Sequence, residues 1–350
     1  MKRNVLSVAL ALILCFVLSG CELWMDGEYL SVTPHHEQNI GAGADPIEID
    51  SYAQLPEALT ELVASGVSSG AVIAPALNHA DLRRYLDEAV EHVKNDTPIG
   101  AYAVESISYE IGTNRGNFAV AFYVNYFINR ADVLRIKQAK EMDEATQMIG
   151  TALDECEDSL LVLVDDYRDV DLRQTVRHYA YQNPDKVMEI PQVTTRVYPE
   201  TGSSRLIEIR FTYQNARSEL LRMKEQVDQI FTSAELYVKE SANVRDIYTR
   251  LFSFLMERHE YSLESSVTPS YSLLLKGNGD SSAFANVYAA MCRRAGLDCR
   301  TVNGTKNGTP WSWNMVRFRG TYLHVDLLDC NMSGEFTMHN DSEMVGYVWE

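Results

Sequence analysis

Positive charge is scarce in this sequence and is nowhere concentrated. The 350 residues contain 31 Lys and Arg against 49 Asp and Glu, which gives a formal net charge of −18 at neutral pH. No run of Lys or Arg is longer than two residues. Nucleic-acid binding depends on a concentrated basic surface that releases counterions from the phosphates, so this composition argues against a nucleic-acid partner.

Cysteine is also sparse, and its spacing is not that of the common metal sites. The chain has six Cys, with no CxxC pair and no Cys/His spacing suited to zinc. Those beyond residue 21 do not resemble a disulfide framework and are Cys156, Cys292, Cys299 and Cys330. The sequence therefore predicts neither a bound metal nor another cofactor.

Long apolar runs are missing except near the amino terminus. Residues 1–4 form a basic start, and residues 5–18 are apolar apart from Ser7. This run is too short to span a bilayer comfortably and has the length of a signal-peptide core. Leu18-Ser19-Gly20-Cys21 at its end resembles the bacterial lipobox, in which the Cys is lipidated and the peptide before it is removed.

That resemblance implies a lipoprotein signal peptide at 1–20 and a lipid on Cys21. The mature chain would then be anchored on the extracytoplasmic face of the bacterial cell membrane, with the membrane itself as a partner. An ordinary cleaved signal followed by a chance Cys is the alternative. The polar, Gly-containing segment 21–50 is expected to be a tether.

An internal repeat follows the tether. Residues 134–137 (Leu-Arg-Ile-Lys) recur as 221–224 (Leu-Arg-Met-Lys), and Tyr126 recurs as Tyr213, in both cases 87 residues later. We predict two tandem α+β modules of the order helix, strand, helix, strand, strand, at 51–130 and 131–230. Their elements are expected at 55–65, 70–75, 81–95, 102–111 and 117–127, and at 132–153, 159–165, 170–181, 189–198 and 205–213.

The strongest pattern lies in the carboxy-terminal third. A helix is expected at about 241–259, and Ser270–Ala285 leads into a second helix that ends at Gly296. A strand is expected at 299–304, and two aromatic segments follow at 311–316 and 320–326.

The order and spacing of these segments resemble the transglutaminase-like superfamily over residues 240–350. The resemblance implies an α+β domain with a papain-like core, in which a helix packs against a sheet. In active relatives a Cys at the helix N-terminus attacks an acyl group, a His takes the thiol proton, and an Asp orients the His. A helix N-terminus favours the thiolate form of such a Cys.

The positions that match this catalytic triad are Ser281, Trp311 and Asp326, so only the Asp is kept. The indole of Trp311 offers an N–H donor and no acceptor, and it cannot act as a general base. Ser281 then remains an ordinary hydroxyl whose expected role is to cap the helix, a role that Asp280 could fill equally well. The resemblance therefore implies that the usual acyl-transfer chemistry has been lost.

Four further residues match positions around the cleft of the family: Tyr271, Trp313, Asn314 and His324. The two aromatic residues are expected to pack, and the amide to bind backbone. Alternation puts His324 on the same strand face as Asp326. An active amidase or peptidase that uses Ser281 as a non-standard nucleophile therefore remains the alternative.

The leading hypothesis is a lipid-anchored cell-envelope protein whose inactive transglutaminase-like domain binds or scaffolds a ligand. A peptide, a protein and peptidoglycan are the candidate ligands. In a third, purely structural hypothesis, Trp311 fills the cleft and the two repeats do the binding.

Overall fold

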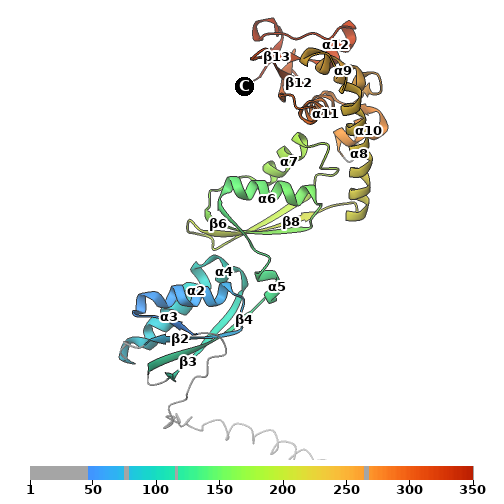
Figure 1. Ribbon diagram of the computed structural model, residues 1–350. Helices are drawn as coiled ribbons and strands as arrows, with labels where there is room; N and C mark the ends of the chain where they lie inside the picture. The colour runs from blue at the N-terminus through green and yellow to red at the C-terminus, as the bar shows by residue number, and fades with distance from the viewer. Residues whose placement is uncertain (1–45, 75–78, 115–116, 264–267, 350) are drawn as a thin grey trace, which may run out of the picture.

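Three units follow one another along the chain in Figure 1: a first α+β module, a second α+β module and a C-terminal domain. This computed structural model describes residues 46–74, 79–114, 117–263 and 268–349. The predicted signal peptide at 1–20, Cys21 and nearly all of the predicted tether at 21–50 lie outside the described residues. In the part of the chain that is described, no helix is both long and apolar enough to cross a membrane.

The first module is a four-stranded sheet with helices packed on it. Its elements are β1 (Ile47–Glu48), the short 3-10 helix η1 (Tyr52–Gln54), α2 (Leu55–Ala64), β2 (Ser69–Ala74), α3 (His79–Asp96), α4 (Pro98–Ala103), β3 (Val104–Asn114) and β4 (Asn117–Tyr126). The strand order is β1-β2-β4-β3, with β1 parallel to β2 and the other neighbours antiparallel.

The second module has the same topology. Its elements are α5 (Arg130–Val133), β5 (Lys137–Glu141), α6 (Met142–Asp154), β6 (Ser159–Asp166), α7 (Leu172–Gln182), β7 (Gln192–Tyr198) and β8 (Arg205–Thr212). The strand order is β5-β6-β8-β7, again with one parallel pair followed by two antiparallel pairs. That the two modules are copies of one sequence unit stays a prediction.

Several predicted elements differ from those in the structure. The helix expected at 132–153 is instead α5, the edge strand β5 and α6, and β1 lies within the range 21–50 predicted as a tether. Only Ala139 of β5 is buried, and the other four residues of the strand are Lys, Gln or Glu, so it lacks the apolar alternation that would identify it. The similar segments 134–137 and 221–224 are not equivalent, because the first leads into β5 and the second lies inside α8 (Arg217–Val238).

The two modules pack together through the second sheet, whose strand β6 is apolar on both faces. Val162 and Val164 lie in the core of the second module. Leu161 and Leu163 of the same strand pack against the core of the first module, together with the fully buried Leu206 of β8. An apolar run on both faces is the pattern of a strand that is covered on both sides.

The C-terminal domain packs α11 against an antiparallel sheet of order β13-β12-β11-β14. Its elements after α8 are α9 (Val244–Met256), β9 (Glu260–Tyr261), α10 (Pro269–Lys276), β10 (Asn278–Gly279), α11 (Ser281–Arg294), β11 (Cys299–Lys306), β12 (Thr309–Phe318), β13 (Thr321–Val325), α12 (Leu327–Ser333), the 3-10 helix η2 (Asp341–Glu343) and β14 (Tyr347–Val348). The fold class of the whole described chain is mixed α and β, as predicted.

The long helix α8 packs in the core of this C-terminal domain, although its Arg217 and Lys224 also bond to the end of α6 in the second module. Its buried residues Val227 and Phe231 belong to the same hydrophobic cluster as Tyr248 of α9 and Tyr288 of α11. The helix begins inside the range 131–230 predicted for the second module, so that range runs into the C-terminal core. The cysteines of the described chain beyond residue 46, which are Cys156, Cys292, Cys299 and Cys330, are buried and free.

Candidate functional site

The N-terminus of α11 meets β12 at Ser281. The preceding residue, Asp280, is the N-cap, and its carboxylate accepts a hydrogen bond from the Ala283 N–H at 2.8 Å. Of the two capping residues that the sequence offers, the structure uses Asp280 and not Ser281. Ser281 is 8% exposed, and its Oγ accepts a hydrogen bond from the backbone N–H of Ser312 at 3.2 Å. The hydroxyl thus joins the start of α11 to β12.

Trp311 and Asp326 are in direct contact. The indole Nε1–H of Trp311 donates a hydrogen bond to Oδ2 of Asp326 at 2.7 Å. Asp326 is 5% exposed and is the N-cap of α12, where its Oδ1 accepts from the N–H groups of Leu328 and Asp329 at 3.0 and 3.3 Å. The structure therefore brings the three triad-equivalent residues to one place, with the indole N–H directed at the carboxylate.

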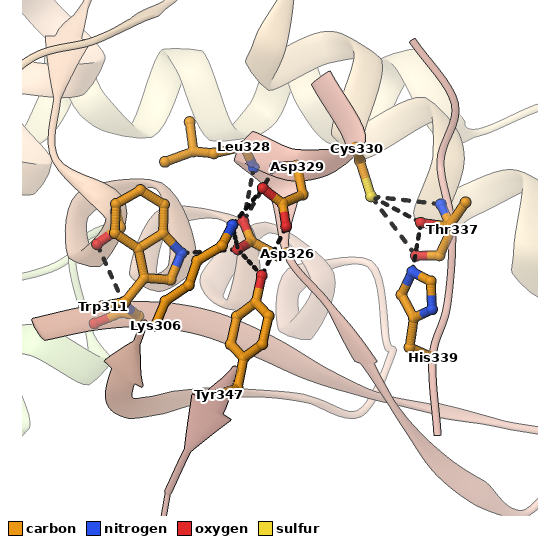
Figure 2. A network of polar contacts seen from close by, with 11 residues as sticks. Lys306, Trp311, Asp326, Leu328, Asp329, Cys330, Thr337, His339 and Tyr347 are labelled. Carbon is orange, nitrogen blue, oxygen red and sulfur yellow. Dashed lines mark hydrogen bonds and ion pairs between the residues drawn. The ribbon is translucent and has the colours of Figure 1, made fainter. Parts of the chain in front are cut away.

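Three further side chains complete a polar network around Asp326 (Figure 2). Nζ of Lys306 lies 3.2 Å from Oδ2 of Asp326 and also contacts Oδ1 of Asp329. The Tyr347 hydroxyl lies 2.7 Å from a carboxylate oxygen of each Asp. The ammonium group of Lys306 lies 5.2 Å from the ring centroids of both Trp311 and Tyr347. One cation is therefore held between two carboxylates and two aromatic rings.

The network changes the proton affinity of its members. Burial raises the pKa of the Tyr347 phenol, and the hydrogen bonds to Asp326 and Asp329 raise it further, so the phenol stays a donor. Burial opposes ionisation of Asp329, but hydrogen bonds from Lys306 and Tyr347 outweigh it and lower the pKa of that carboxyl. At neutral pH the Tyr347 phenol is therefore protonated and donates, and the Asp329 carboxylate is ionised and accepts.

Little room is left around Ser281 and Asp326. The space that they line together with Ser312 and Trp313 does not admit a water-sized sphere. In the described part of the chain, no hydrogen bond joins Ser281 to a His, Asp or Glu side chain. The Ser281 hydroxyl is therefore engaged with the backbone of β12 and not with a side chain that could act as a base.

His324 is fully buried and is engaged with other partners. Its Nδ1 accepts a hydrogen bond from the indole N–H of Trp313 at 2.8 Å, and its Nε2 lies 3.2 Å from Oδ1 of Asp341. Because the first bond occupies the Nδ1 lone pair, the neutral ring carries its proton on Nε2 and has no free acceptor. His324 is thus joined to neither Ser281 nor Asp326 by a hydrogen bond.

The remaining cleft-equivalent residues have structural contacts. Asn314 is fully buried and donates to the backbone carbonyl of Ala285 at 2.8 Å, which ties β12 to α11. Trp313 is 1% exposed, and its ring centroid lies 5.1 Å from that of Tyr347. Tyr271 packs against the C-terminal hydrophobic cluster. The predicted packing and backbone roles of these residues agree with these contacts.

Sequence reasoning missed the residues that surround Asp326. Lys306 ends β11, Tyr347 begins β14, and neither lies near Asp326 in the sequence. No local spacing signals a contact between segments that meet only when the sheet forms. In the described residues no group of three or more His, Cys, Asp or Glu side chains is arranged to hold a metal ion.

Comparison with known families matches residues 232–327 to the Transglutaminase-like superfamily. The match includes Ser281, Trp311 and Asp326, and it begins inside α8, which agrees with the packing of that helix in the C-terminal core. The C-terminal part of the chain is therefore a transglutaminase-like domain. No curated protein matches the chain.

Solved structures give distant similarities. A transglutaminase (TGase) structure matches at 9% identity with a TM-score of 0.28, over 60% of this chain and 65% of its own length. A structure described as a "putative cysteine protease" from Cytophaga hutchinsonii matches at 10% identity and a TM-score of 0.27, over 45% of this chain and 70% of its own. A "putative protease" from Parabacteroides distasonis matches at 10% identity and a TM-score of 0.24, over 73% of this chain and 39% of its own. The chain thus covers 65% of the length of the transglutaminase structure and 39% of the length of the Parabacteroides structure.

Proposed function

We propose that this chain is a lipid-anchored protein of the bacterial cell envelope whose transglutaminase-like domain binds a peptide or protein without transferring its acyl group. The observation that carries the proposal is the hydrogen bond from the Trp311 indole to Asp326. In an active site of this family a His would occupy that position, and its second ring nitrogen would accept the proton of the nucleophile. An indole has no second nitrogen, so the orienting bond is kept while the base is lost.

The surroundings of Ser281 support the same conclusion. The carboxylate of Asp280 already occupies the positive end of α11, where it would repel a second anion. A thiolate or alkoxide at position 281 would form next to this charge. The pocket beside Ser281 is also too small for a water molecule. The domain therefore has neither an activated nucleophile nor a place for the group that it would attack.

The location of the protein rests on its sequence. Leu18-Ser19-Gly20-Cys21 carries the proposal that Cys21 is lipidated on the extracytoplasmic side. Labelling of cells with a radioactive fatty acid should mark the full chain and should not mark Cys21→Ala. Incorporation of label into both chains would remove the anchoring proposal, while the proposal on the domain would stand.

A turnover assay tests the loss of chemistry. The full chain is incubated with a panel of peptides that contain Gln and Lys, and hydrolysis, ammonia release and peptide cross-linking are followed by mass spectrometry. We expect no turnover by the wild type or by Ser281→Ala. Turnover by the wild type that disappears in Ser281→Ala would refute the proposal and support the alternative, an amidase or peptidase with a serine nucleophile.

A further inference from the structure

A well-formed pocket at the transglutaminase-like domain lies away from Ser281, Trp311 and Asp326. This pocket of about 660 Å³ lies between α7 of the second module and the α11–β11 segment of the C-terminal domain. Figure 1 shows α7 on the side of the second module that faces α11. Binding pockets for small ligands have volumes of about 300–1,000 Å³, so this one is large enough for a short peptide segment.

The two walls of the pocket are held together by direct contacts. The guanidinium group of Arg293, at the end of α11, donates to the backbone carbonyl of Gln182, at the end of α7. Met188, which follows α7, is 2% exposed and belongs to the hydrophobic cluster of the C-terminal domain. The pocket is therefore a part of the packed structure and is built by both units.

The lining of the pocket holds two guanidinium groups, those of Arg293 and Arg300, and one carboxylate, that of Asp298. A second carboxylate, that of Asp185, also acts on Arg293. Asp298 neutralises only Arg300, whose Nε lies 3.5 Å away, and its other oxygen accepts a hydrogen bond from Tyr322 at 2.6 Å. Among the ion pairs of the described chain, none involves Arg293. A guanidinium group with free N–H donors is suited to a carboxylate.

Amide and hydroxyl groups line the rest of the pocket. Asn286 is 5% exposed and donates to the Ser282 hydroxyl at 3.2 Å. Asn303 accepts a hydrogen bond from the Ser312 hydroxyl on its Oδ1 at 2.8 Å. Asn side chains offer both a donor and an acceptor, which is what a peptide backbone requires.

We propose that this pocket is the ligand site of the protein and that it binds an acidic peptide, with Arg293 and Arg300 on the carboxylate. The proposal rests on the function proposed above and gives it a place and a ligand class. Ser282 lines the pocket and directly follows Ser281, and Ser312 bonds to both Ser281 and Asn303. The pocket is thus next to the closed triad position but separate from it, so binding is retained where the chemistry is lost.

Calorimetric titration of the full chain with defined peptides tests the proposal. The acidic probe is acetyl-Ala-Ala-Glu-Ala-Ala with a free carboxyl end, and the neutral probe has Gln in place of Glu and an amidated end. We expect the acidic probe to bind, the neutral probe to bind at least tenfold more weakly, and added salt to weaken the acidic probe.

Variants locate the site. Arg293→Gln and Arg300→Gln should each weaken the acidic probe about tenfold, because each removes a charge-assisted hydrogen bond. Arg293→Lys keeps the positive charge and should keep part of the affinity. This result would show that the loss in Arg293→Gln comes from the missing charge and not from misfolding. Arg245→Gln, on the exposed side of α9, is the matched control and should bind as the wild type does.

Each other outcome overturns the inference in a recognisable way. Equal binding of both probes, or full affinity in Arg293→Gln and Arg300→Gln, would show that the pocket is not the site, while a peptide-binding function would stand. If inorganic phosphate competes as strongly as the acidic probe, the pocket binds anions in general and the proposal of a peptide ligand is wrong. If neither probe binds to the wild type, the inference fails, and the turnover assay above decides the proposed function separately.

Discussion

Replacing Trp311 by Phe isolates the hydrogen bond between the indole and Asp326. The change keeps an aromatic ring and removes the indole N–H that donates to Asp326 at 2.7 Å. Asp326 is 5% exposed, so water has little access to the acceptor that is set free. Oδ2 of Asp326 accepts hydrogen bonds from Trp311, Lys306 and Tyr347. The variant removes the first and leaves the other two.

The size of the effect follows from the charge on the acceptor. A hydrogen bond to a charged group contributes about 1.5–3 kcal/mol to stability, and one between neutral groups about 0.5–1.5 kcal/mol. The smaller Phe ring adds a cavity cost, so we expect Trp311→Phe to lower the free energy of unfolding by about 2–4 kcal/mol. In an Asp326→Asn background the acceptor is neutral, and the cost of Trp311→Phe should be about 1 kcal/mol smaller.

Guanidinium unfolding followed by tryptophan fluorescence measures this difference. Three of the four Trp lie in the C-terminal domain, so the signal reports on its unfolding. Trp349→Phe is the matched control, because Trp349 packs on Trp313 and His324 and its cost should not depend on Asp326. If Trp311→Phe has the same cost in both backgrounds, the indole stabilises the domain by packing alone and the reasoning from the hydrogen bond is wrong.

Three further predictions concern the same domain. The pKa of Asp329 is lowered in the folded chain, so its contribution is present above the unfolded pKa of about 3.9 and is lost as the pH falls through the lower folded pKa. Unfolding midpoints should therefore fall more on acidification from about pH 6 to about pH 3 in the wild type than in Asp329→Asn, and equal falls would contradict this. Ser281→Cys should show no peptide turnover, and only the double change with Trp311→His can give any; turnover by the single variant would contradict the loss of a base. A Cβ at Gly304 would lie 2.2 Å from the carbonyl oxygen of Val348. Gly304→Ala should therefore displace β14 and cost more than about 1 kcal/mol in unfolding, and an unchanged midpoint would show that the strand end adapts freely.

The hairpins of the two modules and the central helix of the C-terminal domain could be predicted because their signals are local. The alternating residues of β8 and the Gly296 that follows α11 specify these elements from neighbours within a few positions. The edge strands β1 and β5 could not be predicted in this way. Each has few buried side chains, and each becomes a strand only by pairing with β2 or β6.

By itself, the sequence determined which side chains stand at the triad positions: Ser281, Trp311 and Asp326 match the family by their order and spacing, and the lack of an acceptor on an indole follows from its chemistry. Only the tertiary structure decided what surrounds them. Lys306 and Tyr347 reach Asp326 because β11 and β14 are neighbours in one sheet. The pocket lined by Arg293 and Arg300 exists because α7 of one unit packs against α11 of another. Such contacts join residues that are distant in the sequence, and chain packing alone determines which of them meet.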